Sequence, residues 1–297
     1  MNKIERIFCF FILALTLLAG VFPVAARGGN NVSGEVTLET LIEKGDRVAR
    51  EARFDTRSES KLREAIRIYQ KALKLDDHNK HALNMLSLGY FTLAEAYLTK
   101  KEEKKTAYRT GYEYGVESLQ TNKDFAALYD KEGFKALKEL PESVDNVEAL
   151  FWTGANLGRL DETKGVLGAL NDLPALISLN RRVIRVDESY LGGGAHRALG
   201  SIIAELMSRL PWTFVQVNNN DFTWGKAKGH FEKAIELAPG CLESYFSYAK
   251  YYAFNRGKDK FARDLLHKVI NGRPGKKYPL INAIAKKKAK KLLEESF

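Results

Sequence analysis

Apolar residues recur at helical spacing along most of the chain. Between residues 37 and 53, the positions that share one helical face are apolar or small, namely Leu38, Leu41, Ile42, Gly45, Val48, Ala49 and Ala52. This spacing is typical of an amphipathic helix with one buried face. The same period continues through residues 106–119 and 147–160. No segment alternates with the period of two that indicates a strand, so the pattern predicts an all-α protein with about eleven or twelve helices.

The segment 227–274 contains the same pattern of small, aromatic and proline residues twice. The two copies are 35 residues apart and consist of Ala227, Phe231, Ala234, Ile235 and Pro239, then Ala262, Leu266, Val269, Ile270 and Pro274. Between them, Tyr245, Tyr248, Ala249 and Tyr252 suit the first helix of a second pair. This spacing indicates tetratricopeptide-like repeats, in which small residues let paired helices approach and proline ends the second helix. We therefore expect residues 36–297 to form a single helical-repeat domain, an α-solenoid. Such arrays offer concave binding surfaces and only rarely active sites.

Two breaks in the periodicity predict where helices begin. Pro174 fits the start of a helix that runs to about Val186, because the first amide of a helix needs no partner. Gly192, Gly193 and Gly194 precede another apolar run. The glycines could cradle a phosphate, but they lack the lysine and hydroxyl residue of a P-loop. They fit better a turn that lets two helices pack closely.

The first residues have the features of an export signal. Lys3 and Arg6 precede an uncharged run from Ile7 to Ala26, and Val24 and Ala26 are the small residues that a signal peptidase needs. We expect cleavage after Ala26, a flexible leader over 27–35 and a periplasmic protein. The alternative is an uncleaved membrane anchor, since the run is about long enough to span a bilayer.

Composition narrows the classes further. The chain of 297 residues carries a formal net charge of +10 and two cysteines. Removal of residues 1–26 takes away Lys3, Arg6 and Glu5, which leaves +9. Cys241 then remains alone, so the mature chain cannot form an internal disulfide and its stability must come from packing. The lysines near the C-terminus alternate with alanine and leucine, so they predict an amphipathic helix with a solvated face, with lipid headgroups as a possible contact.

The order of motifs resembles a known family. The run VIRVDESYLGGGAHRALGSIIAELMSRL at 183–210 is similar to the central motif of the TRAP transporter T-component family, whose members are periplasmic tetratricopeptide-repeat proteins. Further similar segments occur at 106–119, 148–160 and 230–253. The resemblance implies a helical array with a pore or groove, association with a TRAP solute-binding protein and handling of small, hydrophobic or organic-acid ligands. It also makes a ring-like homo-oligomer plausible. Val21 stands where lipid-anchored members carry cysteine, so no lipid-anchor cysteine is expected.

The candidate site is a groove along the first helices of the repeats. Residues that neighbour the packing positions there mix apolar and polar groups, which suits an apolar ligand or partner helix with a polar end. Tyr190 and His196 are added because they flank the triple glycine. The candidates are Asn84, Leu88, Phe91, Phe151, Tyr190, His196, Phe246 and Lys250. Their aromatic members could equally fill a core.

Catalysis and cofactors have little support. His196 and the upstream Asp187 and Glu188 could perform acid–base chemistry, but no serine or cysteine stands in a nucleophile motif and no metal-ligand spacing is present. We expect no catalytic residue, no metal, no cofactor and no nucleic-acid partner. The leading hypothesis is a non-enzymatic component that docks with a TRAP solute-binding protein and assists transfer of a small ligand. The alternatives are a general periplasmic scaffold that binds peptide segments in envelope complexes, and a hydrolase that uses His196.

Overall fold

Several helices begin where a polar side chain bonds to a free backbone amide group. The side-chain oxygen of Asn79 accepts a hydrogen bond from the amide of Ala82 at 3.1 Å and starts α3 (Lys80–Ala96). Asn146 accepts one from Ala149 at 3.2 Å and starts α6 (Val147–Asp161). Thr223 accepts one from Lys226 at 3.1 Å and starts α10 (Trp224–Leu237). These caps fix the first turns of helices that carry much of the core.

The computed structural model describes residues 36–52, 58–162, 165–210 and 222–296, without the side chains of residues 165–169. These residues contain twelve α-helices and no strand, which confirms the all-α prediction. Besides α3, α6 and α10, the helices are α1 (Leu38–Ala52), α2 (Glu59–Leu73), α4 (Lys101–Gln120), α5 (Lys123–Glu132), α7 (Gly165–Asp187), α8 (Gly194–Arg209), α11 (Leu242–Ser247), α12 (Asp259–Asn271) and α13 (Pro279–Ser296).

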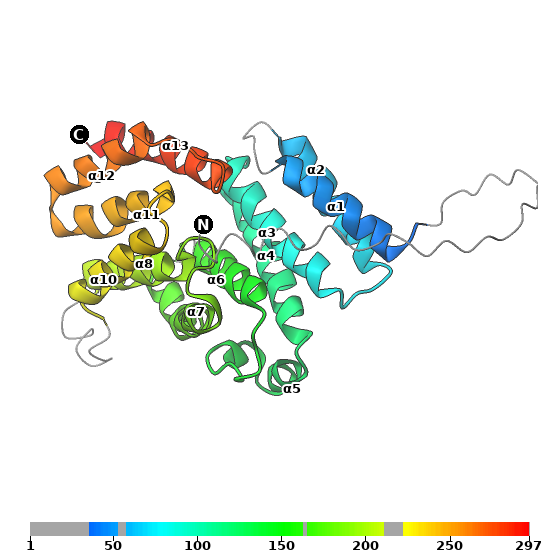
Figure 1. The fold of residues 1–297 in the computed structure, drawn as a ribbon. Helices are drawn as coiled ribbons and strands as arrows, with labels where there is room; N and C mark the ends of the chain where they lie inside the picture. Colours follow the sequence, from blue (N-terminus) through cyan, green and yellow to red (C-terminus); the bar gives the residue numbers. More distant parts are fainter. Residues whose placement is uncertain (1–35, 53–57, 163–164, 211–221, 297) are drawn as a thin grey trace, which may run out of the picture. The chain divides into compact units, whose positions relative to one another are not determined.

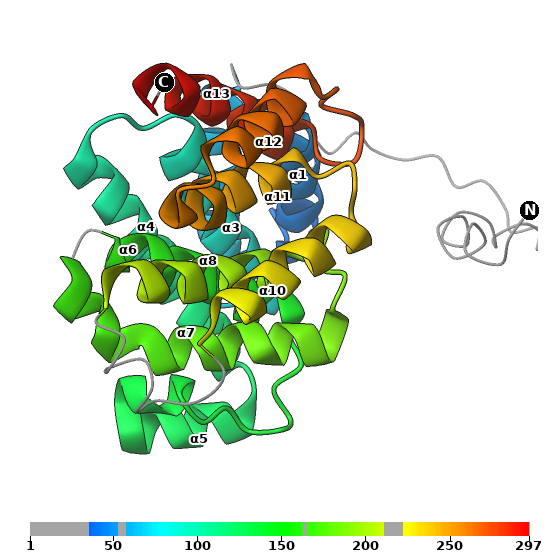
Figure 2. The same ribbon diagram turned by 90° about the vertical axis from the view of Figure 1, so that its left-hand side faces the viewer.

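Consecutive helices pack side by side. α1 packs on α2, α2 on α3, and α3 on α4, while α4 and α7 both pack on α6 (Figure 1). The C-terminal helices continue this order, since α8 packs on α10, and α12 and α13 pack on each other (Figure 2). Residues 36–297 form one compact unit. Its arrangement agrees with a helical-repeat array.

The C-terminal repeat pattern marks buried residues, as predicted. Ala227, Phe231 and Ala234 of α10 are fully buried. Their counterparts Ala262, Leu266 and Val269 of α12 are also fully buried. Figure 2 shows α11 lying between α12 and α10. The repeated small and apolar residues therefore identify the faces of α10 and α12 that form the C-terminal core.

The helix between them is not regular. α11 ends at Ser247 and continues as a π-helical segment from Tyr248 to Ala253, followed by a 3₁₀ turn. A π-helical turn contains more residues than an α-helical turn, so residues beyond Ser247 face directions that an α-helical period does not predict. Tyr248 and Tyr252 are buried as expected.

The prediction for Pro174 is wrong. This residue lies inside α7, which begins at Gly165 rather than at the proline. An internal proline loses one helical hydrogen bond and costs about 3 kcal/mol. Leu176, Leu179 and Val183, which follow the proline on α7, are buried in one core cluster with residues of α6. This tertiary packing favours the helix in spite of the proline.

The triple glycine forms the predicted close turn. Gly192 and Gly193 have φ values of +65° and +68°, which L-residues with side chains rarely adopt. A Cβ atom at Gly192 would lie 2.7 Å from the Cβ of Ala238, and one at Gly194 would lie 2.6 Å from Cε2 of Phe151. The glycines thus let α8 start against both α6 and the end of α10.

Some predictions concern residues that the structure does not describe. The signal peptide expected at 1–26 and the leader expected at 27–35 lie outside the described residues. Among the helices that are described, none is both long and apolar enough to cross a membrane.

Candidate functional site

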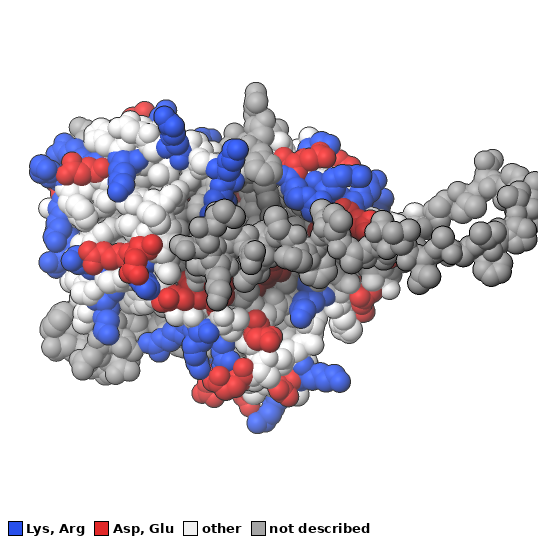
Figure 3. Space-filling view, viewed as in Figure 1, with Lys and Arg blue, Asp and Glu red and all other residues white. Residues whose placement is uncertain are grey.

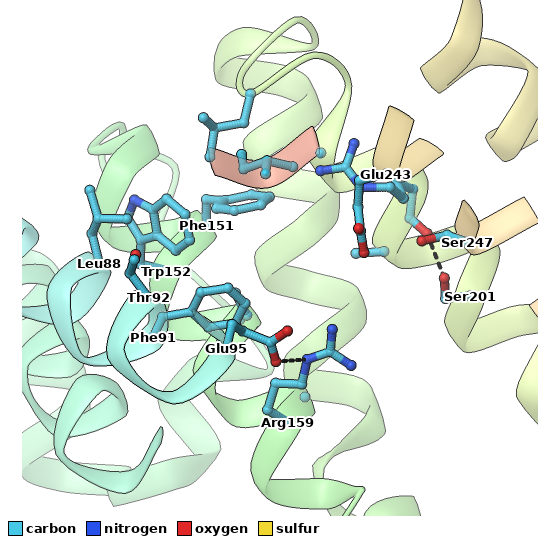
Figure 4. Close-up of a pocket in the computed structure, with 18 of the residues that line it drawn as sticks. Leu88, Phe91, Thr92, Glu95, Phe151, Trp152, Arg159, Ser201, Glu243 and Ser247 are labelled. Atoms are coloured by element: carbon cyan, nitrogen blue, oxygen red, sulfur yellow. Dashed lines mark hydrogen bonds and ion pairs between the residues drawn. The ribbon is translucent and has the colours of Figure 1, made fainter. Parts of the chain in front are cut away.

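A cavity of about 1090 Å³ lies among the helices of the described unit. Residues of α3 and α6 form one side of it, and residues of α8 and α11 face them across the opening (Figure 4). Leu280, Ile281, Ile284 and Lys288 of α13 also line it. A volume of this size suits a small organic ligand.

The wall formed by α3 and α6 is aromatic. Phe91 and Trp152 have ring centroids 5.4 Å apart, and Phe151 meets Trp152 edge to face at 4.9 Å. Tyr190 extends the cluster, with its ring 5.4 Å from that of Phe151. Figure 4 shows Leu88 beside these rings. Together they give the cavity an apolar surface for hydrocarbon or aromatic groups.

A cluster of charged side chains lines one part of the cavity. Glu95 of α3 binds Nε of Arg159 at 3.0 Å and Nζ of Lys288 at 2.5 Å, and it accepts a hydrogen bond from the hydroxyl of Tyr108 at 2.5 Å. Arg159 also pairs with Glu162 at 2.6 Å. Because Lys288 belongs to α13, this cluster joins α13 to α3 and α6.

The charges of this cluster stabilise one another. Burial alone would raise the pKa of Glu95, but Arg159 and Lys288 outweigh it and hold that pKa well below its ordinary value. Burial would also lower the pKa of Arg159, and Glu95 and Glu162 keep it well above its ordinary value. For Tyr108, burial and the carboxylate of Glu95 both raise the pKa. The cluster is therefore a set of satisfied ion pairs in a mostly apolar wall.

The opposite wall is rich in polar groups. Arg197, Ser201 and Glu205 follow one another at four-residue intervals on α8 and all line the cavity. Glu243, Ser247 and Lys250 line it from α11 and the π-helical segment. Figure 4 places Ser201, Glu243 and Ser247 across the cavity from the aromatic wall. The two walls thus offer an apolar and a polar side to one occupant.

Six of the eight predicted residues line this cavity, namely Asn84, Leu88, Phe91, Phe151, Tyr190 and Lys250. Asn84 also has a structural role. Its amide donates to Glu148 at 2.8 Å and to Asn146 at 3.1 Å, and its oxygen accepts from Ser118 at 2.6 Å. Asn84 therefore ties α3, α4 and α6 together at the edge of the cavity.

The other two predicted residues do not line it. Phe246 is buried in the C-terminal core, because α11 turns Ser247 toward the cavity instead. His196 is buried too, and its two ring nitrogens are engaged by Nδ1 of His230 at 2.8 Å and by Glu188 at 3.0 Å. Burial and then the neighbouring His196 lower the pKa of His230 to about 4. Both ring nitrogens of His196 are thus engaged, and neither is hydrogen-bonded to a serine or cysteine of the described residues.

Sequence reasoning missed the cavity residues Glu95, Arg159, Arg197 and Lys288. The sequence pattern predicts that the lysines near the C-terminus lie on a solvated helix face. The side chain of Lys288, one of them, is only 30% exposed and binds Glu95. The charge of these residues is visible in the sequence, but the pairing between helices far apart in the chain is not. In the part of the chain that the structure describes, no group of three or more His, Cys, Asp or Glu side chains could hold a metal ion.

Comparison with known proteins agrees with this architecture. A comparison with curated proteins found no match to the chain. The sequence pattern of the TRAP transporter T-component family matches residues 59–296, which include every helix from α2 to α13. The match covers well over half of the chain and includes both walls of the cavity, so the chain belongs to the TRAP transporter T-component family.

Proposed function

We propose that this chain is a non-enzymatic, periplasmic component of TRAP transport that docks with a solute-binding protein and receives a small ligand in its cavity. Membership of the T-component family gives the chain a role in TRAP transport. The cavity of about 1090 Å³ is the observation that supports the ligand-handling part of the proposal. The export signal expected at residues 1–26 supports a periplasmic location.

The lining supports a small ligand over an extended peptide. Peptide grooves in helical arrays are usually open and concave, and they hold a segment through repeated polar contacts to its backbone. Here an aromatic wall with Phe91, Phe151 and Trp152 faces a polar wall with Ser201 and Ser247 (Figure 4). Such a pocket, mostly apolar with a few polar groups that fix orientation, is typical of small-molecule sites.

The face of the molecule shown in Figure 3 carries no single block of charge. Lys and Arg side chains are interspersed there with Asp and Glu side chains over the described surface. A partner that docks there would therefore need a matching pattern of both signs rather than a single block of opposite charge.

Docking is tested by purifying the tagged full chain from its own host and identifying bound proteins by mass spectrometry. A TRAP solute-binding protein recovered in stoichiometric amount supports the proposal. Recovery of envelope assembly factors without a solute-binding protein contradicts it and favours the scaffold alternative.

Ligand handling is tested with two variants of α8. Ser201→Phe places a bulky ring in the cavity, whereas Ser208→Phe places the same ring on an exposed part of the helix. Native mass spectrometry of the purified chains should find a bound small molecule in the wild type and in Ser208→Phe, and less of it in Ser201→Phe. Equal amounts in both variants would place the ligand elsewhere.

A further inference from the structure

Arg197 differs from the other arginines of the cavity in its partners. Arg159 pairs with Glu95 and Glu162, and Arg209 pairs with Glu205. Arg197 has no carboxylate within 4.0 Å among the residues that the structure describes. A guanidinium group that faces a cavity without a counter-ion is available to an anionic ligand.

The hydrogen bonds of Arg197 leave one edge of its guanidinium group open. Nη1 donates to Oγ of Ser244 at 3.2 Å and lies 3.8 Å from Sγ of Cys241. Nε and Nη2 make no hydrogen bond to any described residue. These two N–H groups point in parallel and match the two oxygens of a carboxylate. Ser244 is fully buried, so it holds the other edge of the group in place.

The other charged groups of this wall do not supply a carboxylate to Arg197. Glu205 pairs with Arg209 on α8. Lys250 donates to the hydroxyl of Tyr251 at 3.0 Å, and Glu243 has no cation within 4.0 Å among the described residues. The preference for a carboxylate therefore rests on the open edge of Arg197 itself and not on a net charge of the cavity.

The opposite wall specifies the rest of the ligand. Gly194, one helical turn before Arg197, packs so closely on Phe151 that a Cβ atom there would lie 2.6 Å from the ring. The start of α8 therefore lies beside Phe151. Further along the cavity, the cluster of Phe91, Phe151 and Trp152 lies across from the polar wall (Figure 4). An apolar tail would pack on these rings while the carboxylate stays at α8.

We propose that the cavity binds an amphipathic monocarboxylate, with the carboxylate held by Nε and Nη2 of Arg197 and the apolar tail on the aromatic wall. This inference rests on the proposed ligand-handling function, and it assigns to Arg197 the role of selecting acids over neutral molecules of the same length. Ser244 is the positioning residue for Arg197.

Isothermal titration calorimetry with decanoate and 1-decanol tests the proposal on the wild-type chain without any substitution. Decanoate should bind about tenfold or more tightly than 1-decanol, because its carboxylate forms charge-assisted hydrogen bonds with Arg197 that the hydroxyl of 1-decanol cannot form. Equal affinities for the two probes would overturn the assignment of Arg197 but would leave a ligand-binding cavity. Failure of both probes to bind would contradict the ligand-handling function as well.

Variants then locate the carboxylate. Arg197→Gln should weaken decanoate binding about tenfold and leave 1-decanol unchanged, and Arg197→Lys should fall between, since it keeps the charge without the two parallel donors. Arg273→Gln is the matched control, because it makes the same change at an exposed arginine that does not line the cavity. Circular dichroism and thermal unfolding of each variant establish that it is folded. Unchanged decanoate binding in Arg197→Gln, or an equal loss in Arg197→Gln and Arg273→Gln, would overturn the proposal.

Discussion

The charged cluster around Glu95 allows a quantitative prediction. Glu95→Gln keeps the size of the side chain and an acceptor oxygen but removes the negative charge that Arg159 and Lys288 share. The side chain of Glu95 is 10% exposed, and those of Arg159 and Lys288 are 22% and 30% exposed. Loss of one partner from a fully buried ion pair costs about 3–5 kcal/mol. Since the cations here are partly exposed and Arg159 keeps Glu162, we expect a loss of roughly 2–3 kcal/mol in the free energy of unfolding.

Urea denaturation at pH 7 measures this loss, provided that the dependence of the free energy on urea concentration is the same for variant and wild type. Lys288→Met removes the partner from α13 without removing the aliphatic stem of the side chain. The double variant should lose less than the sum of the single losses, with a coupling of about 1 kcal/mol. Lys291→Met is the matched control on α13, because Lys291 is 73% exposed and pairs with Glu295 at 3.5 Å, so its loss should stay within about 0.5 kcal/mol. If Glu95→Gln were as stable as Lys291→Met, the cluster would not form in solution.

The same cluster predicts the response to acid. The pKa of Glu95 is lower in the folded chain than in the unfolded chain, since Arg159 and Lys288 outweigh the effect of burial. Its contribution to stability is therefore complete above the unfolded pKa of about 4.3 and is lost as the pH falls toward the folded pKa. Stability of the wild type should fall more steeply than that of Glu95→Gln in this acidic range, which urea denaturation at several pH values would show. Parallel curves for the two proteins would contradict this.

Three further predictions concern other parts of the fold. Phe231→Ala should cost about 3–5 kcal/mol in urea denaturation, because Phe231 is fully buried, whereas Phe261→Ala, at a residue 37% exposed, should cost less than about 1 kcal/mol. Gly192→Ala should lower the thermal unfolding temperature because of its positive φ and the 2.7 Å approach to Ala238, whereas Gly229→Ala, with open space around it, should not. His230 has a pKa of about 4, below its ordinary value, so the stability that it provides is complete above the unfolded pKa of about 6.5 and is lost as the pH falls toward 4. His230→Asn should flatten the stability curve over this interval, and an unchanged slope would show that the His196–His230 contact does not determine it.

Sequence reasoning predicted the fold from local signals. Helical periodicity identified α1 and the C-terminal repeats, because α1, α10 and α12 each bury one face of small and apolar residues. The spacing of apolar residues could not identify the π-helical segment after Ser247. A π-helical turn holds more residues than an α-helical turn, and the packing of the tyrosines on neighbouring helices is not visible in the sequence. Sequence reasoning also failed at Pro174, where tertiary packing overrides a strong local preference.

The candidate site was predictable only where one helix determined it. Leu88 and Phe91 were predicted as neighbours of the packing positions of α3, and both line the cavity. The same reasoning predicted Phe246 on α11, where Ser247 lines the cavity instead. On a short helix, two different faces can both carry apolar residues. Only the contacts with neighbouring helices decide which of these faces points toward the cavity. For His196, the nearby Glu188 was apparent in the sequence, whereas His230 comes from another helix.

The local sequence shows part of what distinguishes Arg197. Arg209 and Arg159 each have a glutamate three or four residues away, whereas Arg197 has only glycine and serine at that spacing. Whether another helix supplies a carboxylate is decided only in the folded chain. In the folded chain, Arg159 meets Glu95 from α3 and Arg209 meets Glu205 one turn away. Arg197 meets only the hydroxyl of Ser244 and the thiol of Cys241 among the described side chains. A cation becomes a binding group when folding leaves it without a counter-ion at a cavity wall. The contrast between Arg197→Gln and Arg273→Gln, the same change inside and outside the cavity, therefore examines a property of the fold and not of the composition.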